Sequence, residues 1–379
     1  MNDPQNAREL IAAIGPRVRK SPFFEATVDA GLRAVSTYNH MWLPMSYGDP
    51  EGEYRRLTEG VSMWDVAAQR HLEVSGPDAD ELVQLVTVVD TSEVPRGSGR
   101  YAPMVDHSGT LINDPVLLRF DDGSWRFSIA DADVRLWLDA VAHGRGLDCT
   151  VTELDTATMA VQGPLAGDVL GALGCDDLGG LADFERRSAT LEGIDVIVSR
   201  SGWSNQGGYE LFLDDTDRAL ELWAAVADAG RRFDIGPGAP NPSERLENVL
   251  LSYGTDTGYG ATPIELGMTD LIGFAGYDFI GRSALLTQRD SGRSRRLVGV
   301  RLDGAPIDPL PNPVPLTLDG DEHGQLRSAA WSPRFSTNLG LALVPAGDDP
   351  GTVGRTTIAG RTHRAELVGL PFADSLDER

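Results

Sequence analysis

The sequence lacks the features that mark a secreted or membrane-spanning protein. It contains only two cysteines, Cys149 and Cys175, and neither CxxC spacing nor clustered histidines accompany them. A disulfide framework or a zinc site is therefore not expected. No stretch reaches the roughly 18 apolar residues of a membrane span, and residues 1–20 lack the apolar core of a signal peptide. We expect a cytoplasmic protein without a metal.

Positive charge is also scarce. The chain has 33 Lys and Arg against 57 Asp and Glu, which gives a formal net charge of −24. Such a surface repels phosphate backbones and anionic lipids, so neither nucleic acid nor a membrane is an expected partner. The acidic residues are spread along the chain and form no tail, which favours a general role in solubility.

The common catalytic motifs are missing as well. The sequence contains no GxGxxG, P-loop, GxSxG, HExxH or calcium-binding loop. Its composition is nevertheless that of a globular chain, with 41% hydrophobic and 24% charged residues, and 379 residues allow two or three domains. Function must therefore be sought in less familiar patterns.

Periodicity predicts two units of mixed strands and helices, which is an α+β arrangement. The first unit has a strand, a helix, an antiparallel meander, a second helix and a closing strand, over 71–75, 77–87, 101–130, 133–142 and 148–154. The second repeats the theme with a strand, a helix, a hairpin, a strand and a helix, over 159–162, 165–173, 189–200, 209–213 and 218–229.

The last part of the chain has a different character. Asn241, Pro242 and Glu244 form a good helix start, and Gly254 is a suitable stop, which predicts a helix between them. From about residue 293, short β-like runs broken by Pro and Gly predict a small barrel or sandwich. These runs cover 297–302, 329–331, 339–344, 356–358 and 365–367.

Three segments stand out for local chemistry. The first is Asn113-Asp114 within the apolar run 111–115, because an Asp there is costly to bury without a partner or a role. Taken alone, these residues favour a simpler interpretation, in which Asp114 ends a strand and accepts hydrogen bonds from the backbone.

The second segment is the loop 200–210. Gly207 and Gly208 let the backbone approach a ligand, Trp203 and Tyr209 could stack on a flat ring, and Glu210 offers two acceptors to adjacent N–H donors, as in a pterin. The alternative is a hairpin loop with an exposed Glu.

The third segment is the Gly- and Pro-rich run 236–241. It delivers Arg245 into the first turn of a helix, where the guanidinium could hold a carboxylate or orient Glu210. The alternative is a surface charge pattern.

Several motifs together resemble one family. Trp64-Asp65-Val66, Asn113-Asp114, the run from Ser201 to Glu210, and Glu244 to Glu247 followed by 251–254 occur in the order and spacing of the glycine-cleavage T-protein superfamily. Within it the chain most resembles the dimethylsulfoniopropionate demethylases, through the further segments 19–23, 38–41, 106–118 and 161–164. The likeness extends from about residue 16 to Val344.

The resemblance implies a three-domain, ring-like α+β fold with folate in the central opening. Its expected parts are a discontinuous folate-binding α+β domain (1–62 with 155–285), an α+β domain with the antiparallel meander (63–154), and a C-terminal β-barrel (286–379). It further implies a soluble enzyme that transfers a methyl group from a small methylated donor to N5 of tetrahydrofolate, giving 5-methyltetrahydrofolate, with dimethylsulfoniopropionate as the first candidate donor. The likeness is compatible with a homodimer.

The same resemblance assigns residues. Asp114 is the expected catalytic residue beside N5. Residues expected to bind tetrahydrofolate are Glu210, Tyr101, Gln162 and Arg245, and those expected to line the donor pocket are Trp203, Tyr209, Phe212 and Trp64.

Two departures leave the donor open. Phe212 stands where a tyrosine is expected in the demethylases, and residues 181–185 lack an expected tryptophan. A betaine, an N-methylated amine or a methoxy-aromatic are therefore alternative donors. An aminomethyltransferase acting on a lipoyl carrier is a second hypothesis, although that family usually has Asp-Asp where this chain has Asn113-Asp114. A non-catalytic folate-binding protein is the third.

Overall fold

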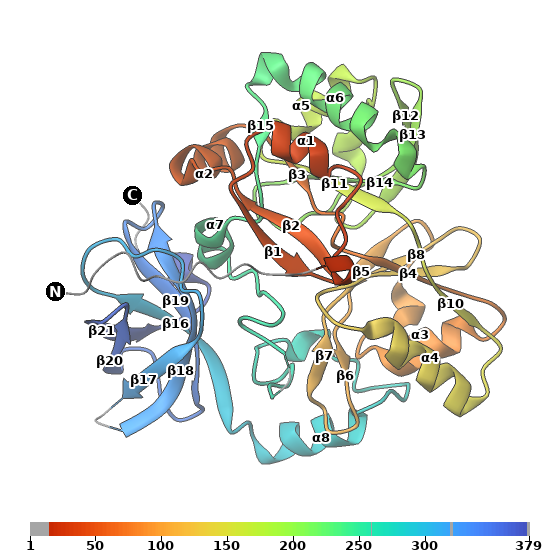
Figure 1. Cartoon of the computed structure of the whole chain (residues 1–379). Helices are drawn as coiled ribbons and strands as arrows, with labels where there is room; N and C mark the ends of the chain where they lie inside the picture. Colours follow the sequence, from red (N-terminus) through yellow and green to blue (C-terminus); the bar gives the residue numbers. More distant parts are fainter. Residues whose placement is uncertain (1–14, 259, 319–320, 377–379) are drawn as a thin grey trace.

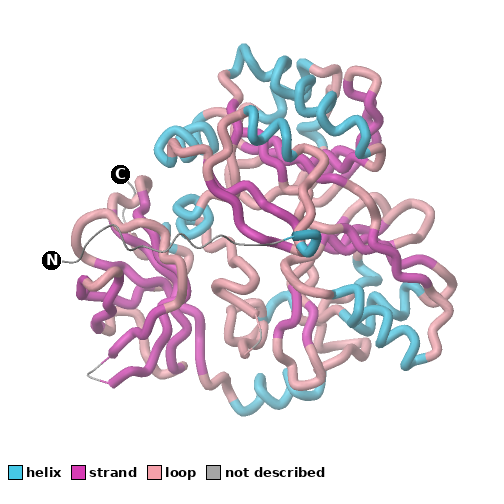
Figure 2. Tube along the Cα trace, viewed as in Figure 1, coloured by secondary structure: helices cyan, strands magenta, loops and turns pink. Residues whose placement is uncertain are grey.

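The computed structural model describes residues 15–258, 260–318 and 321–376. Three units surround the middle of the molecule, and helix α7 (Pro242–Glu247) with the loop that follows it lies between them (Figure 1). Two of the units combine sheets with helices and the third is a barrel, as the distribution of helix and strand in Figure 2 shows. The predicted α+β class and three-part arrangement are confirmed.

The first unit is built on a six-stranded sheet in the order β12-β13-β14-β11-β3-β15. Alternate residues of its central strands are apolar and pack against helices α5 (Ala166–Ala172) and α6 (Ala219–Gly230), which leaves the other face toward the middle of the molecule (Figure 1). The predicted elements are confirmed with small shifts at their ends. The strands are β3 (Ser62–Asp65), β11 (Ala157–Gln162), β12 (Arg186–Leu191), β13 (Ile194–Ser199), β14 (Gly208–Leu213) and β15 (Gly236–Pro237).

The second unit has a five-stranded sheet in the order β10-β4-β9-β8-β5, covered by α3 (Ala79–Val86) and α4 (Val134–Arg145). The meander predicted over 101–130 is present, but its strands are interrupted at two prolines, Pro103 and Pro115. Proline has no N–H for the ladder, so the chain leaves the sheet there. The resulting strands are β4 (His71–Ser75), β5 (Gly99–Tyr101), β6 (Met104–Val105), β7 (Leu111–Asn113), β8 (Val116–Arg119), β9 (Trp125–Ser128) and β10 (Thr150–Glu153).

The third unit is a closed barrel in the order β16-β19-β18-β17-β20-β21, which confirms the barrel alternative. Strand β17 was not predicted, and it contains Pro315, a residue type that is rare inside strands. Pro315 faces Gln325 of β18 but lies outside the register with β20, so its missing N–H interrupts no ladder on that side. The strands are β16 (Arg295–Leu302), β17 (Val314–Leu318), β18 (Asp321–Ser332), β19 (Thr337–Pro345), β20 (Val353–Ile358) and β21 (Arg361–Val368).

Helix α7 starts as predicted but ends early. The side chain of Asn241 caps it by accepting from the backbone N–H groups of Ser243 and Glu244, both at 3.0 Å. The prediction that the helix continues to Gly254 is wrong, since it ends at Glu247. The side chain of Asn248 donates back to the Glu244 carbonyl at 2.9 Å, and Val249 takes a positive φ of 56°, which turns the chain away.

The remaining elements join these units. A hairpin of β1 (Ala34–Tyr38) and β2 (Met41–Ser46) lies near the middle of the molecule, between α1 (Phe24–Asp29) and α2 (Pro50–Glu59) in sequence, and α8 (Arg282–Ser291) leads to the barrel (Figure 1). The domain boundaries stay a prediction, and eight apolar side chains between 261 and 285 pack in the core of the five-stranded unit. No helix in the described ranges is long and apolar enough to cross a membrane.

Candidate active site

Asp114 lies at the break between β7 and β8, where Pro115 ends the ladder. It is only 9% exposed, and its Oδ2 accepts a hydrogen bond from the Tyr101 hydroxyl at 2.7 Å. Burial raises the pKa of Asp114 to about 7, while the Tyr101 bond lowers this pKa and the charge of Asp256 raises it. Asp114 therefore ends a strand, as the simpler interpretation held, but it is also a buried carboxyl that titrates near neutral pH.

A second phenol accompanies Tyr101. Tyr38, at the end of β1, is mostly buried, and burial followed by the charge of Asp114 raises the pKa of its hydroxyl. The pKa of Tyr101 is raised by burial, by Asp114 and by Tyr38. Both phenols therefore stay protonated as hydrogen-bond donors. Tyr38 belongs to a segment that carried the family resemblance, yet sequence patterns assigned it no role.

Glu210 lies on β14, on the face of the sheet opposite the α5–α6 core. It is 5% exposed, so the alternative of an exposed hairpin Glu is wrong, and its Oε2 accepts from the Ser201 hydroxyl at 2.5 Å. Burial raises its pKa and the Ser201 bond lowers it. Across the sheet, Glu210 pairs with Ser199 and Ala160, and Ala160 pairs with Trp64.

The structure does not bring Tyr209 to the same face as Glu210. Neighbouring residues of a strand point to opposite faces, and Tyr209 packs in the core under α5 and α6. Phe212 shares the face of Glu210 but is 2% exposed, because its ring packs edge-on against His71 with centroids 4.7 Å apart. Burial lowers the pKa of His71 to about 3, so this imidazole is neutral. Neither aromatic ring faces open space.

Trp64 is also a packing residue in this structure. It is 1% exposed, lies against Leu57 and Val66, and donates from Nε1 to the Ser62 hydroxyl at 2.5 Å. A Cβ added to Gly238 would lie 2.8 Å from that Nε1, so the glycine lets the loop 236–241 lie directly on the indole.

Gln162 holds the loop 201–208 by hydrogen bonds from β11. Its Nε2 donates to the Ser201 carbonyl at 3.2 Å and its Oε1 accepts from the Ser204 hydroxyl at 2.8 Å. A Cβ at Gly202 would lie 2.2 Å from the Gln162 amide, and one at Gly208 would lie 2.5 Å from the Val161 carbonyl. Only glycine permits this close approach, and the Gln162 amide is committed to the loop.

Trp203 projects from that loop and is partly exposed. The Arg245 guanidinium lies 6.0 Å from its ring centroid and donates to Asp256, which also accepts from the Ser252 N–H at 2.8 Å. The barrel contributes Ser328, whose hydroxyl donates to the other Asp256 oxygen. Arg245 is 7% exposed, so the surface alternative is wrong, and the carboxylate it holds is that of Asp256. Sequence patterns contained no signal for Asp256.

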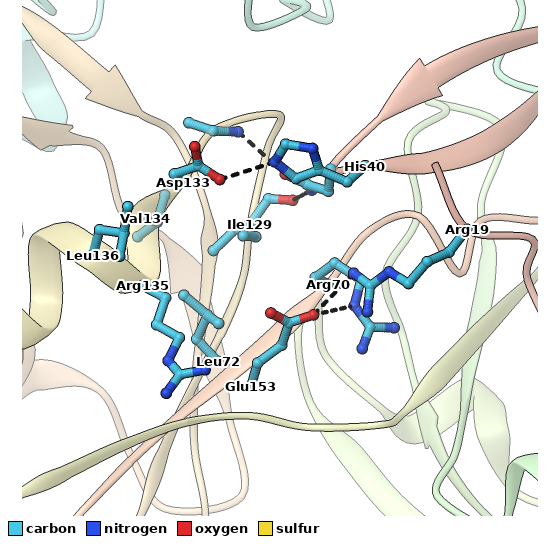
Figure 3. Close-up of a pocket in the computed structure, with 12 residues that line it drawn as sticks. Arg19, His40, Arg70, Leu72, Ile129, Asp133, Val134, Arg135, Leu136 and Glu153 are labelled. Atoms are coloured by element: carbon cyan, nitrogen blue, oxygen red, sulfur yellow. Dashed lines mark hydrogen bonds and ion pairs between the residues drawn. The ribbon is translucent and has the colours of Figure 1, made fainter. Parts of the chain in front are cut away.

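A cavity of about 250 Å³ lies elsewhere, between the β1–β2 turn and the first turn of α4 (Figure 3). Most of its ionisable side chains pair with one another, since Glu153 binds Arg70 at 3.0 Å and Arg19 at 3.1 Å, and His40 lies 3.0 Å from Asp133. Arg135 pairs with Asp139 outside the cavity. None of the predicted site residues lines this cavity.

Comparisons with known proteins agree with this architecture. The GCVT N-terminal domain matches residues 23–275, and the glycine cleavage T-protein C-terminal barrel domain matches residues 295–374. Dimethylsulfoniopropionate demethylase DmdA of Ruegeria pomeroyi is 34% identical over 88% of this chain and 92% of its own length. An aminomethyltransferase of Moorella thermoacetica is 28% identical over 94% and 98%. The crystal structure of the glycine cleavage system aminomethyltransferase T from Bartonella henselae superposes with a TM-score of 0.84 at 22% identity, covering 96% of this chain and all of that one.

Proposed function

Because this chain belongs to the glycine cleavage T-protein family, we propose that it is a tetrahydrofolate-dependent demethylase of a small methylated compound, with dimethylsulfoniopropionate as the first candidate donor. The observation that carries the proposal is the buried Asp114 carboxyl, bonded to Tyr101 and with a pKa of about 7. A carboxyl of this kind can take up a proton at physiological pH.

Two buried acids fit the cofactor. Glu210 has one oxygen engaged by Ser201 and lies on the sheet face opposite the α5–α6 core, so the carboxylate can accept from the amino-pyrimidine N–H groups of a pterin. Asp114 would lie beside N5. Tetrahydrofolate supplies the N5 amine that takes the methyl group.

The reaction requires mainly that the protein position the methyl donor against N5. The methyl carbon of a sulfonium donor is activated. Bound tetrahydrofolate would supply the N5 lone pair for the new carbon–nitrogen bond, and the electron pair of the broken carbon–sulfur bond would go to sulfur. Positioning and exclusion of water supply most of the catalysis. The ionised Asp114 carboxylate would accept the proton that N5 loses, and the Trp203 ring would offer one face to a cationic donor.

An aminomethyltransferase is the second candidate, favoured by the 28% identity to such an enzyme over nearly the full chain. The pair Asn113-Asp114 argues against it, because the aminomethyltransferase family usually has Asp-Asp at these two positions. Betaines, N-methylated amines and methoxy-aromatics are alternative donors for the first candidate.

The test is to incubate the protein with tetrahydrofolate and each donor separately, and to measure 5-methyltetrahydrofolate by chromatography. The panel is dimethylsulfoniopropionate, glycine betaine, an N-methylated amine, a methoxy-benzoate, and an aminomethylated lipoyl carrier assayed for methylenetetrahydrofolate. Turnover with dimethylsulfoniopropionate alone supports the proposal. Turnover only with the carrier would replace it by the second candidate, and folate binding without turnover on any donor would indicate a non-catalytic folate-binding protein.

A further inference from the structure

Glu244 is a buried acid that the proposed mechanism does not use. It lies in the first turn of α7 and is 0% exposed. Its Oε1 accepts from the Asn205 backbone N–H at 3.0 Å, from Gln206 Nε2 at 2.9 Å and from Asn248 Nδ2 at 2.8 Å. Its Oε2 is buried and has no hydrogen-bond partner among the described residues. Stability alone does not favour such a carboxylate, because a buried oxygen without a partner costs free energy.

Two of these three donors belong to residues 203–207, the segment that carries Trp203. Gly202 precedes this segment and Gly207 ends it, with φ values of 157° and 76° that favour glycine. Asn205 and Gln206 also line a cavity of about 540 Å³ between α2, α7 and the barrel, which leaves open space on one side of the segment. Gln162 holds Ser204, and the Asn248 side chain accepts from Asn205 Nδ2 at 3.1 Å. The Glu244 carboxylate is the buried acid that binds the middle of the segment, at the Asn205 backbone and the Gln206 side chain.

The next residue of α7 supports the ring itself. Arg245 lies 6.0 Å from the Trp203 centroid and is fixed by the buried Asp256. Consecutive residues of one helical turn thus hold the backbone and the ring of the same loop. Glu210, in contrast, follows the loop on a continuous strand and makes no bond to Glu244 among the described residues.

We propose that Glu244 is a positioning residue for donor binding, which fixes the 203–207 segment so that Trp203 forms one wall of the donor pocket. This inference rests on the proposed function for the identity of the donor. The part of it that says Glu244 holds the 203–207 segment does not depend on that function. It separates two tasks within the site, since loss of Glu244 affects the donor and leaves the folate clamp on β14 intact.

The experiment compares Glu244→Ala, Glu244→Gln and Glu247→Ala in the full chain. Glu247 is the matched control, because it is also buried on α7, at 3% exposed, but accepts from Tyr54, Ser332 and Arg334 rather than from the loop. Hydrogen exchange of a peptide spanning 201–208, measured by mass spectrometry, reports how readily the loop opens. Steady-state kinetics with dimethylsulfoniopropionate and calorimetry with tetrahydrofolate report the two ligands.

For Glu244→Ala we expect loop exchange and the donor KM to rise about tenfold, with kcat changed less than about threefold and the folate Kd unchanged, as loss of charge-assisted hydrogen bonds predicts. Glu244→Gln keeps the accepting oxygen and should restore both values. Glu247→Ala should leave loop exchange at the wild-type rate.

Unchanged loop exchange and an unchanged donor KM in Glu244→Ala would overturn the proposal. If that variant does not fold, Gln206→Ala removes one of the three donors and should shift both values in the same direction by a smaller factor. A wild-type protein that turns over no donor, while Glu244→Ala still loosens the loop, would refute the proposed function and leave the hold on the loop established.

Discussion

The two buried acids of the site lie in contrasting surroundings. Asp114 occupies a break between two strands and has a phenol as its partner, whereas Glu210 lies within a continuous strand and has a serine hydroxyl. Burial raises the pKa of both, but only Asp114 also has a neighbouring acid, Asp256, that raises it further. A carboxyl that must exchange a proton benefits from irregular backbone and nearby charge, and one that must hold a ring benefits from a rigid strand.

The largest expected effect comes from Asp114→Asn. The amide keeps the shape but cannot take the N5 proton, so kcat/KM should fall by about a thousandfold, within the range usual for general acid–base groups. Folate affinity, measured by calorimetry, should change less than about threefold. A variant that lost folate binding instead would show that Asp114 holds the cofactor, and the contrast with Glu210 would be wrong.

Glu210→Ala should produce the opposite pattern. Loss of two charge-assisted hydrogen bonds to the pterin predicts a folate Kd about a hundredfold higher. At saturating folate, the rate of methyl transfer in a single turnover should stay within about tenfold of the wild type. Unchanged folate affinity would remove Glu210 from the site, and the matched variant Glu210→Gln tests whether charge or shape is recognised.

Sequence patterns predicted the regular parts of this molecule well. Alternation of apolar residues in 209–213 and helical spacing in 218–229 were sufficient, because each element buries one face against the other. The N-cap of α7 followed from Asn241 and Pro242 for the same local reason. The barrel and the three-part arrangement also agreed with the family resemblance.

What sequence patterns did not indicate depended on contacts between distant residues. Tyr209 and Phe212 were expected in the donor pocket, but strand register places one in the core and the other against His71. The early end of α7 leaves the chain free to return so that Asp256 meets Arg245, 11 residues earlier. No local pattern reports such a pairing, which is why Asp256 and the position of Tyr38 appear only in the structure.

Tyr101→Phe tests how the Tyr101 hydroxyl shifts the pKa of Asp114. Its hydrogen bond stabilises the ionised carboxyl and so lowers the pKa of Asp114, which means that its removal should raise this pKa above about 7. If transfer needs the ionised form, the rising limb of the kcat/KM profile moves to higher pH. Activity should fall several-fold at pH 7 and recover near pH 9. A uniform loss at every pH would indicate that Tyr101 binds a ligand and has no influence on Asp114.

The smallest expected effect is on stability, and its dependence on pH tests whether burial raises the pKa of Asp114. The native pKa of Asp114 lies above its ordinary value of 3.8, so the folded state binds its proton more tightly than the unfolded state. Its contribution to stability is complete below about pH 4 and is lost as pH rises through about 7. Asp114→Asn, which carries no charge, should therefore be more stable than the wild type by about 1 to 2 kcal/mol at pH 8 and equal to it near pH 4. Urea unfolding at both pH values measures this difference, and a gap that grew toward low pH would contradict a raised pKa, because only a carboxyl with a lowered pKa loses stability there.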